Sequence, residues 1–118
     1  MPGQDEIRLK HMLDAAKAAS EFAAGRKRED LANDRQFVFA LVRAVEVIGE
    51  AASNVSDEFR ARYAQLPWRD IVGMRNRLIH AYFDINLDIL WSTVQQDIPS
   101  LITAIQAILD ADGAAPNK

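Results

Sequence analysis

The sequence contains no cysteine, which excludes disulfide bonds, thiolate zinc sites and cysteine nucleophiles. It also lacks an uninterrupted apolar run of the roughly 20 residues that a membrane-spanning helix needs. Its first residues, Met-Pro-Gly-Gln-Asp-Glu, show neither a basic region nor a hydrophobic stretch, so we expect no signal peptide. Together these absences predict a cytoplasmic protein without a membrane partner.

Several catalytic motifs are missing as well. There is no Gly-rich phosphate loop, no nucleotide-binding βαβ unit and no Ser-His-Asp arrangement. We therefore expect that ATP is not a substrate of this chain and that it carries no cofactor and no metal. Histidine is scarce: His11 stands beside charged residues, and we interpret it as a surface or interface residue. The other histidine, His80, has more distinctive neighbours.

The composition that remains is that of one soluble domain. The chain has 118 residues, of which 49% are hydrophobic and 26% charged, enough to bury a core without metal or disulfide support. A net charge of −3 argues against a protein that coats nucleic acid nonspecifically. The segment 60–80, however, holds five arginines against one acid, Asp70. This concentration of charge predicts a local anion site.

Apolar residues recur at spacings of three and four along most of the chain, which predicts an all-α protein. Five helices are expected, and their approximate ranges are 5–24, 34–54, 57–63, 67–81 and 87–110. Short connections between long helices favour an antiparallel helical bundle of four main helices plus a short one. We expect residues 1–112 to form this domain, residues 113–118 to fray, and the protein to be a homodimer.

Turn and cap residues set the expected boundaries. Gly25 should end the first helix, and Gly25–Asp30 and Phe83–Ile85 read as turns. The expected N-cap of the second helix is Asn33 or Asp34, while Ser56 and Asn86 should cap later helices. Pro99 falls inside the periodicity of the last helix and should kink that helix without ending it.

The segment whose side chains could take part in catalysis is Arg75-Asn76-Arg77-Leu78-Ile79-His80-Ala81-Tyr82. On an ideal helix Asn76 and His80 share a face, whereas Arg75 and His80 are about 140° apart. Arg75 and His80 can converge only if the helix ends near Ile79 or the arginine side chain wraps round. Two interpretations stay open: a catalytic site, or a histidine and arginines that merely suit the C-terminal end of a helix dipole.

Such residues could cleave RNA without a metal. A neutral imidazole can take the proton of a ribose 2′-OH, whose oxygen then attacks the adjacent phosphorus. A guanidinium stabilises the charge that gathers on the phosphoryl oxygens, and Asn76 can orient the imidazole or bind a phosphate oxygen. The products would be a 2′,3′-cyclic phosphate and a 5′-OH. A symmetric dimer would supply a second histidine as general acid.

The segment resembles the Arg-Asn-x-x-x-His motif of the HEPN superfamily, and Arg75-x4-His80-x-Tyr82 is similar to that of its HepT-like group. Further similarities lie in Ile48-Gly49-Glu50-Ala51, Pro67-Trp68, Leu90-Trp91 and Ile98-Pro99, so the resemblance covers most of the chain. Ala81 stands where glycine is more usual in the group.

The resemblance implies an endoribonuclease toxin of a toxin–antitoxin pair, with its cleft at a homodimer interface and RNA, tRNA among the candidates, as substrate. It implies that Arg75 and His80 are catalytic and that Asn76 assists them. The implied antitoxin partner is a minimal nucleotidyltransferase, which silences the toxin by adding AMP to Tyr82. The attached phosphodiester would bring negative charge and bulk beside Arg75 and compete with substrate phosphate.

Weaker signals have plainer interpretations. Arg69 and Arg77 are secondary candidates for contacting RNA phosphates, and Arg60 and Arg62 either extend that track or are simply solvated. We interpret Arg43, Glu46 and Glu50 as a salt-linked polar stripe, not a metal site, and Trp68 and Trp91 as core residues instead of base-stacking platforms. The alternative function is a noncatalytic helical adaptor that holds a nucleotidyltransferase or its nucleotide, with Arg75 as an anion anchor.

Overall fold

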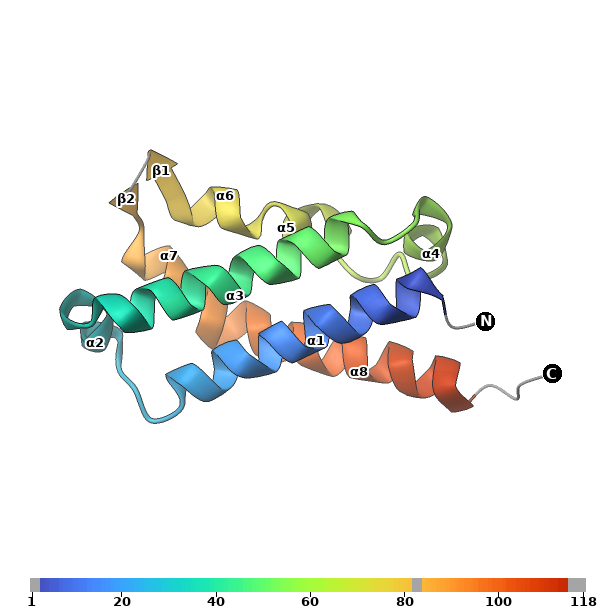
Figure 1. Ribbon diagram of the computed structural model, residues 1–118, viewed down its shortest axis with the longest axis horizontal. Coiled ribbons are helices and arrows are strands. Elements are labelled where there is room, and N and C mark those ends of the chain that lie inside the picture. The colour runs from blue at the N-terminus through green and yellow to red at the C-terminus, as the bar shows by residue number, and fades with distance from the viewer. Residues whose placement is uncertain (1–2, 82–83, 115–118) are drawn as a thin grey trace.

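A computed structural model of the chain describes the backbone of residues 3–81 and 84–114 and the side chains of residues 3–79 and 84–111. The molecule is an elongated helical bundle of 53 × 29 × 20 Å, which confirms the predicted all-α class (Figure 1). Its helices are α1 (Gln4–Ala23), α2 (Arg28–Asn33), α3 (Arg35–Ser53), α4 (Asp57–Arg62), α5 (Trp68–Val72), α6 (Met74–Leu78), α7 (Leu87–Ser92) and α8 (Ile98–Ala114). Two short strands, β1 (Ile79–Ala81) and β2 (Asp84–Ile85), pair at one end of the bundle.

Helix α3 is central, as its wide apolar face predicts. It runs antiparallel to α1 on one side, and the α5–α6 segment lies along another side (Figure 1). Helix α8 packs on α1 from behind. The side chains that are fully shielded from solvent come from all of these helices and include Leu9, Met12, Leu41, Val45, Ile48, Leu78, Leu90, Ile98 and Ile105. One stripe of α3 remains wholly or partly exposed beside α5 and α6, and it includes Arg43, Glu46 and Glu50.

The predicted N-caps are confirmed. Asp34, Ser56 and Asn86 each accept a hydrogen bond from the backbone N–H three residues further on, at 3.1, 3.1 and 3.0 Å. Each bond satisfies one of the N–H groups that the first turn of a helix leaves without a partner. Gly25 ends the first helix with a φ of 74°, a conformation that glycine adopts without steric cost.

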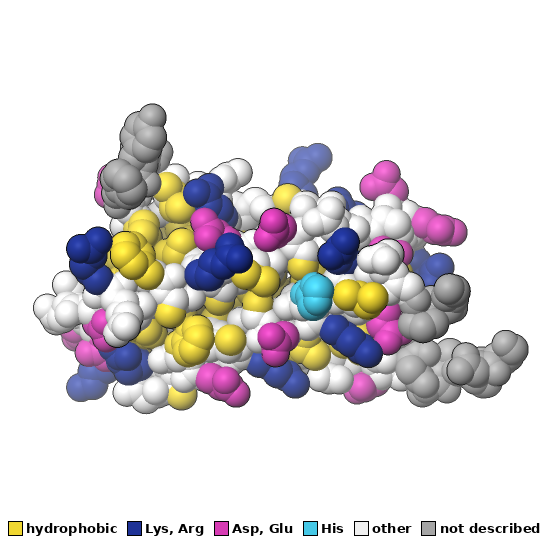
Figure 2. All heavy atoms as spheres, in the orientation of Figure 1, with side chains coloured by type: hydrophobic (Ala, Val, Ile, Leu, Met, Phe, Trp, Pro, Cys, Tyr) yellow, Lys and Arg dark blue, Asp and Glu magenta, His cyan; other side chains and the backbone are white. Residues whose placement is uncertain are grey.

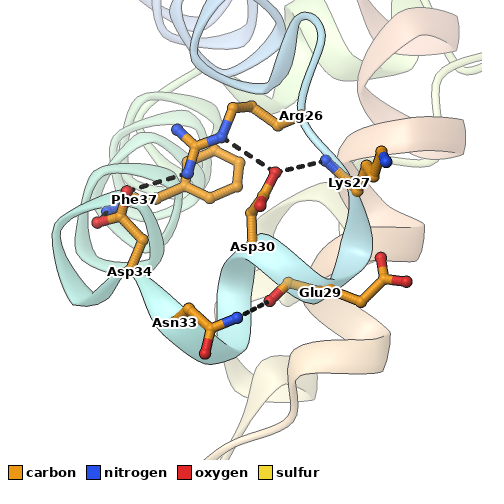
Figure 3. Close-up of polar contacts among 7 residues, drawn as sticks. All are labelled: Arg26, Lys27, Glu29, Asp30, Asn33, Asp34 and Phe37. Atoms are coloured by element: carbon orange, nitrogen blue, oxygen red, sulfur yellow. Dashed lines mark hydrogen bonds and ion pairs between the residues drawn. The ribbon is translucent and has the colours of Figure 1, made fainter.

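The predicted turn over Gly25–Asp30 is wrong in its second half, because helix α2 begins at Arg28. Two acidic groups hold this short helix in place (Figure 3): the backbone N–H of Lys27 donates to Asp30 at 2.8 Å, and the Arg26 guanidinium pairs with both Asp30 and Asp34 at 3.3 and 2.9 Å. Arg26 also lies 4.0 Å above the ring of Phe37. With only six residues, α2 is too short to show an apolar period in the sequence.

The same contacts lower the pKa of both carboxyl groups. For Asp30 the main cause is the hydrogen bond from the Lys27 backbone, followed by the bond from Arg26. For Asp34 the main cause is the bond from the Phe37 backbone, again followed by Arg26. In each case donors that favour the charged carboxylate outweigh the effect of desolvation.

The prediction of a single helix over 67–81 is wrong in two places. It breaks at Gly73, between α5 and α6, where a Cβ would lie 3.3 Å from the carbonyl oxygen of Arg69. It then ends at Leu78, and the chain continues as strand β1. Ile79 pairs with Ile85 of β2, and the backbone N–H of Asn86 donates to the carbonyl of Leu78 at 2.7 Å. The turn predicted there is therefore replaced by strand pairing at positions 84 and 85, while Phe83 lies outside the described residues.

The last helical segment begins at Leu87 and continues through Pro99, as predicted, but it extends to Ala114 and so includes residues 113 and 114 of the expected tail. Immediately before Pro99 the helix widens into a π-helical turn, η1 (Thr93–Asp97). A proline removes one backbone donor and pushes against the preceding turn, and widening that turn relieves the conflict. Residues 115–118 of the expected tail lie outside the described residues. No helix in the described part of the chain is long and apolar enough to cross a membrane.

Candidate active site

Arg75, the first residue of the motif, points toward α3 and is held there by a carboxylate. Its Nε donates to Oε2 of Glu46 at 2.7 Å, a short, charge-assisted hydrogen bond. The second oxygen of Glu46 lies 3.8 Å from Nη1 of Arg43, one turn earlier on α3. The side chain of Arg75 is 49% exposed. The salt-linked stripe predicted on α3 is therefore confirmed for Arg43 and Glu46.

These side chains line an open groove of about 390 Å³ between α3 and the α5–α6 segment. The lining residues are Arg43, Glu46, Gly49, Glu50, Ser53, Val72, Arg75 and Asn76. Gly49 lets the two elements approach closely, because a Cβ there would lie 3.2 Å from the carbonyl oxygen of Val72. Two polar residues of the motif, Arg75 and Asn76, thus share one groove with a carboxylate from another helix.

Arg77 points the other way. Its Nη2 lies 3.7 Å from Oδ2 of Asp97, at the end of η1, and it lines a second, more apolar groove between α5–α6 and α8. Arg69 is exposed on α5 and lines neither groove. The two secondary candidates for phosphate contact therefore do not lie beside Arg75, and their role stays a prediction.

The other two arginines of the basic segment also lie away from the groove. Arg60 donates to the carbonyl of Ala52 at 2.8 Å and lies over the ring of Trp68, and Arg62 lies over the ring of Phe59. Trp68 is a core residue, as predicted, and its indole N–H donates to the carbonyl of Tyr63 at 3.0 Å. Trp91 is partly buried against the core. The basic segment is thus distributed over several surfaces.

His80 lies in the backbone of β1, two residues beyond the end of α6. The helix does end near Ile79, which is one of the conditions under which Arg75 and His80 can converge. The side chain of His80, and Tyr82 as a whole, lie outside the described residues, so their place in the site stays a prediction. His11 is exposed on α1, as expected of a surface residue.

Charges of both signs are interspersed on one face of the molecule (Figure 2). On the face drawn in Figure 2, Lys and Arg side chains alternate with Asp and Glu side chains and with apolar residues. Among the described residues, no three His, Asp or Glu side chains gather at the spacing of a metal site. The face drawn in Figure 2 is therefore not a broad basic surface, and within the groove the positive charge comes from Arg43 and Arg75.

Sequence reasoning did not anticipate two of these groove residues. The sequence predicts that Glu46 and Arg43 belong to a polar stripe, but no local pattern indicates that this stripe faces Arg75. Gly49 drew notice only as part of a family resemblance. The signal that could have indicated the close approach there is the glycine itself, because a glycine inside a helical pattern often has a packing reason.

Comparison with known proteins connects this arrangement to one family. The family model described as "Ribonuclease HepT-like" matches residues 12–108. The "Probable ribonuclease HepT" of Thermococcus cleftensis is 41% identical over 93 residues, which is 79% of this chain and 84% of that protein. A "Putative RNase" of Caldanaerobacter subterraneus is 38% identical over 104 residues, covering 88% of this chain and 93% of that protein. A "Putative RNase" of Methanocaldococcus jannaschii is 34% identical over 120 residues and covers 100% of this chain and 99% of its own length. No solved structure matches the chain.

Proposed function

Because this chain belongs to the HepT-like ribonuclease family, we propose that it is a metal-independent endoribonuclease that cleaves RNA by attack of a 2′-OH on the adjacent phosphate. The observation that carries the proposal is the placement of Arg75. Its guanidinium is fixed through Nε by Glu46 and lines an open groove, where its terminal nitrogens would bind a phosphate. A prearranged guanidinium stabilises a developing phosphorane charge without having to reorganise during the reaction.

We assign the proton transfers to His80. The neutral imidazole accepts the 2′-OH proton, the oxygen bonds to phosphorus, and the bond to the 5′ oxygen breaks. Asn76 lines the same groove as Arg75 and would bind a phosphate oxygen or orient the imidazole. A homodimer would provide the second histidine, which protonates the leaving 5′ oxygen.

The proposed regulation acts at Tyr82. A partner nucleotidyltransferase would transfer AMP from ATP to its hydroxyl, with release of pyrophosphate and of the hydroxyl proton. The toxin activity would stop because the added phosphodiester brings a negative charge to the anion site. The test is to incubate the protein with a cognate nucleotidyltransferase and labelled ATP. Wild type should be labelled and lose ribonuclease activity together, whereas Tyr82→Phe should remain unlabelled and active.

The first experiment for the function is cleavage of total RNA and of tRNA by the purified protein in EDTA. Wild type should cut and leave 2′,3′-cyclic phosphate ends. Both His80→Ala and Arg75→Ala should lose the activity by about 100-fold or more. Arg62→Ala is the matched control, since it removes an arginine whose side chain stacks on Phe59 outside the groove.

The outcomes separate the nuclease from the adaptor alternative. No cleavage by folded, unmodified wild type across a broad RNA pool would refute the nuclease. Retained binding of a nucleotidyltransferase by that inactive protein would then favour the adaptor. Activity that disappears in EDTA and returns with a divalent ion would refute the metal-independent mechanism while leaving the enzyme class in place.

A further inference from the structure

We propose that Arg43 is a second phosphate-binding residue, which contacts the RNA backbone in the same groove as Arg75. This inference rests on the proposed ribonuclease function and adds a substrate-binding residue to it. Arg43 lies outside the Arg-Asn-x-x-x-His segment and outside the cluster of arginines at 60–80. Only the packing of α6 on α3 brings it beside Arg75.

The geometry places two guanidinium groups on either side of one carboxylate. Glu46 lies 2.7 Å from Nε of Arg75 through one oxygen and 3.8 Å from Nη1 of Arg43 through the other. The negative charge of Glu46 is shared, so this part of the groove keeps a net positive charge for a phosphodiester.

Arg43 is the more available of the two cations. Its side chain is 68% exposed, and its contact with Glu46 is longer than a hydrogen bond. An ion pair of this length between exposed groups contributes little to stability, so Arg43 can exchange Glu46 for a phosphate at low cost. Arg75, with its short bond to Glu46, is instead held in one orientation.

The two ends of the groove differ in charge. Along α3, Arg43 and Glu50 stand on opposite sides of Glu46, and both line the groove. One turn before Arg43, Phe39 lines a neighbouring groove together with Ile79 of β1, the strand that carries His80. The positive end of the groove therefore faces the strand with the proposed general base, whereas Glu50 repels phosphate at the other end. RNA should extend from Arg75 toward Arg43 and away from Glu50.

Binding measurements with a noncleavable RNA test the assignment. The probe is a fluorescein-labelled single-stranded oligonucleotide with 2′-O-methyl groups, which lack the attacking hydroxyl. Its Kd is measured by fluorescence anisotropy in EDTA between 50 and 300 mM salt. Loss of one phosphate contact should reduce the magnitude of the slope of log K against log salt by about 0.7, as expected for single strands.

Arg43→Ala should show this smaller slope and a Kd raised about fivefold, while Arg43→Lys should keep most of the slope. Glu50→Gln should have the opposite effect and tighten binding, because it removes a repelling charge. Lys17→Ala is the matched control: Lys17 is exposed on α1 and lies outside the groove, so the same loss of charge there should leave the slope unchanged. In cleavage assays Arg43→Ala should raise KM and leave kcat nearly unchanged.

The result that would overturn the assignment is an Arg43→Ala protein with the slope and Kd of wild type, while wild type binds and cleaves RNA. That outcome would leave the proposed nuclease standing. Loss of nucleotidyltransferase binding in Arg43→Ala, with RNA binding intact, would also overturn it and assign the groove to a protein partner. If wild type neither binds nor cleaves RNA, the proposed function itself fails, and the Arg43 assignment fails with it.

Discussion

Replacing Leu78 by alanine should destabilise the protein and detach the motif from the core. Leu78 is the last residue of α6, its side chain is fully buried, and it lies between Arg75 and His80 in the sequence. Helix α6 has five residues, too few to be stable alone, so its position depends on the burial of Met74 and Leu78. Loss of either side chain should therefore lower the stability of the fold and change the position of Arg75 in the groove.

The magnitude follows from burial. Leucine-to-alanine changes at fully buried sites cost about 3 kcal/mol or more, the sum of lost transfer free energy and the cavity left behind. Unfolding entropy scales with chain length, and for a chain of 118 residues a loss of 1 kcal/mol lowers Tm by about 4 °C. Leu78→Ala should therefore lower Tm by about 12 °C. Leu78→Ile, which conserves volume, should cost less than about 1.5 kcal/mol.

Thermal unfolding followed by circular dichroism at 222 nm measures this change. All variants should be compared at one protein concentration, since an oligomer would make Tm concentration-dependent. The control is Val72→Ala on α5, where the side chain is 36% exposed and truncation should change stability by no more than about 0.5 kcal/mol. A Tm for Leu78→Ala within 3 °C of wild type would refute the placement of this side chain in the core.

Three further predictions follow from contacts at the groove and at α2. Glu46→Gln keeps an oxygen that can accept from Arg75 Nε and should retain most of kcat/KM, whereas Glu46→Ala should lose about tenfold in steady-state cleavage with little change in Tm. Gly49→Val should lower Tm in the same melts, because its side chain would press on the Val72 carbonyl, 3.2 Å from a Cβ at that position. The pKa of Asp34 is depressed, chiefly by a backbone N–H of α3, so its ionisation stabilises the fold above its unfolded pKa of about 3.9 and that contribution is lost as pH falls through the folded pKa. Asp34→Asn should accordingly show a smaller drop in Tm between pH 6 and pH 3 than wild type, and an equal drop would contradict the assignment.

The errors in reading the chain from its sequence have a common cause. The long helices and the caps at Asp34, Ser56 and Asn86 are predictable, because periodicity and capping are local properties. Helix α2 and the break at Gly73 are not predictable in this way, because elements of five or six residues carry too few apolar positions to define a period. Helix α4 is equally short but is marked by its cap Ser56, whereas α2 follows Lys27, which gives no such signal. The β1–β2 pairing depends on contact between Ile79 and Ile85, which no local pattern records.

The candidate site also has features that local sequence determines and features that only helix packing determines. The sequence by itself determined the helical class, the family resemblance and the candidates Arg75, Asn76 and His80, because these rest on residue type and spacing along one segment. It could not determine which arginine shares the groove with Arg75. Only the tertiary structure decided that, by turning Arg77 toward Asp97 and bringing Arg43 and Glu46 of α3 to Arg75. The physical reason is that the direction of a side chain is fixed by its own helix, whereas its partner is fixed by the packing of one helix on another.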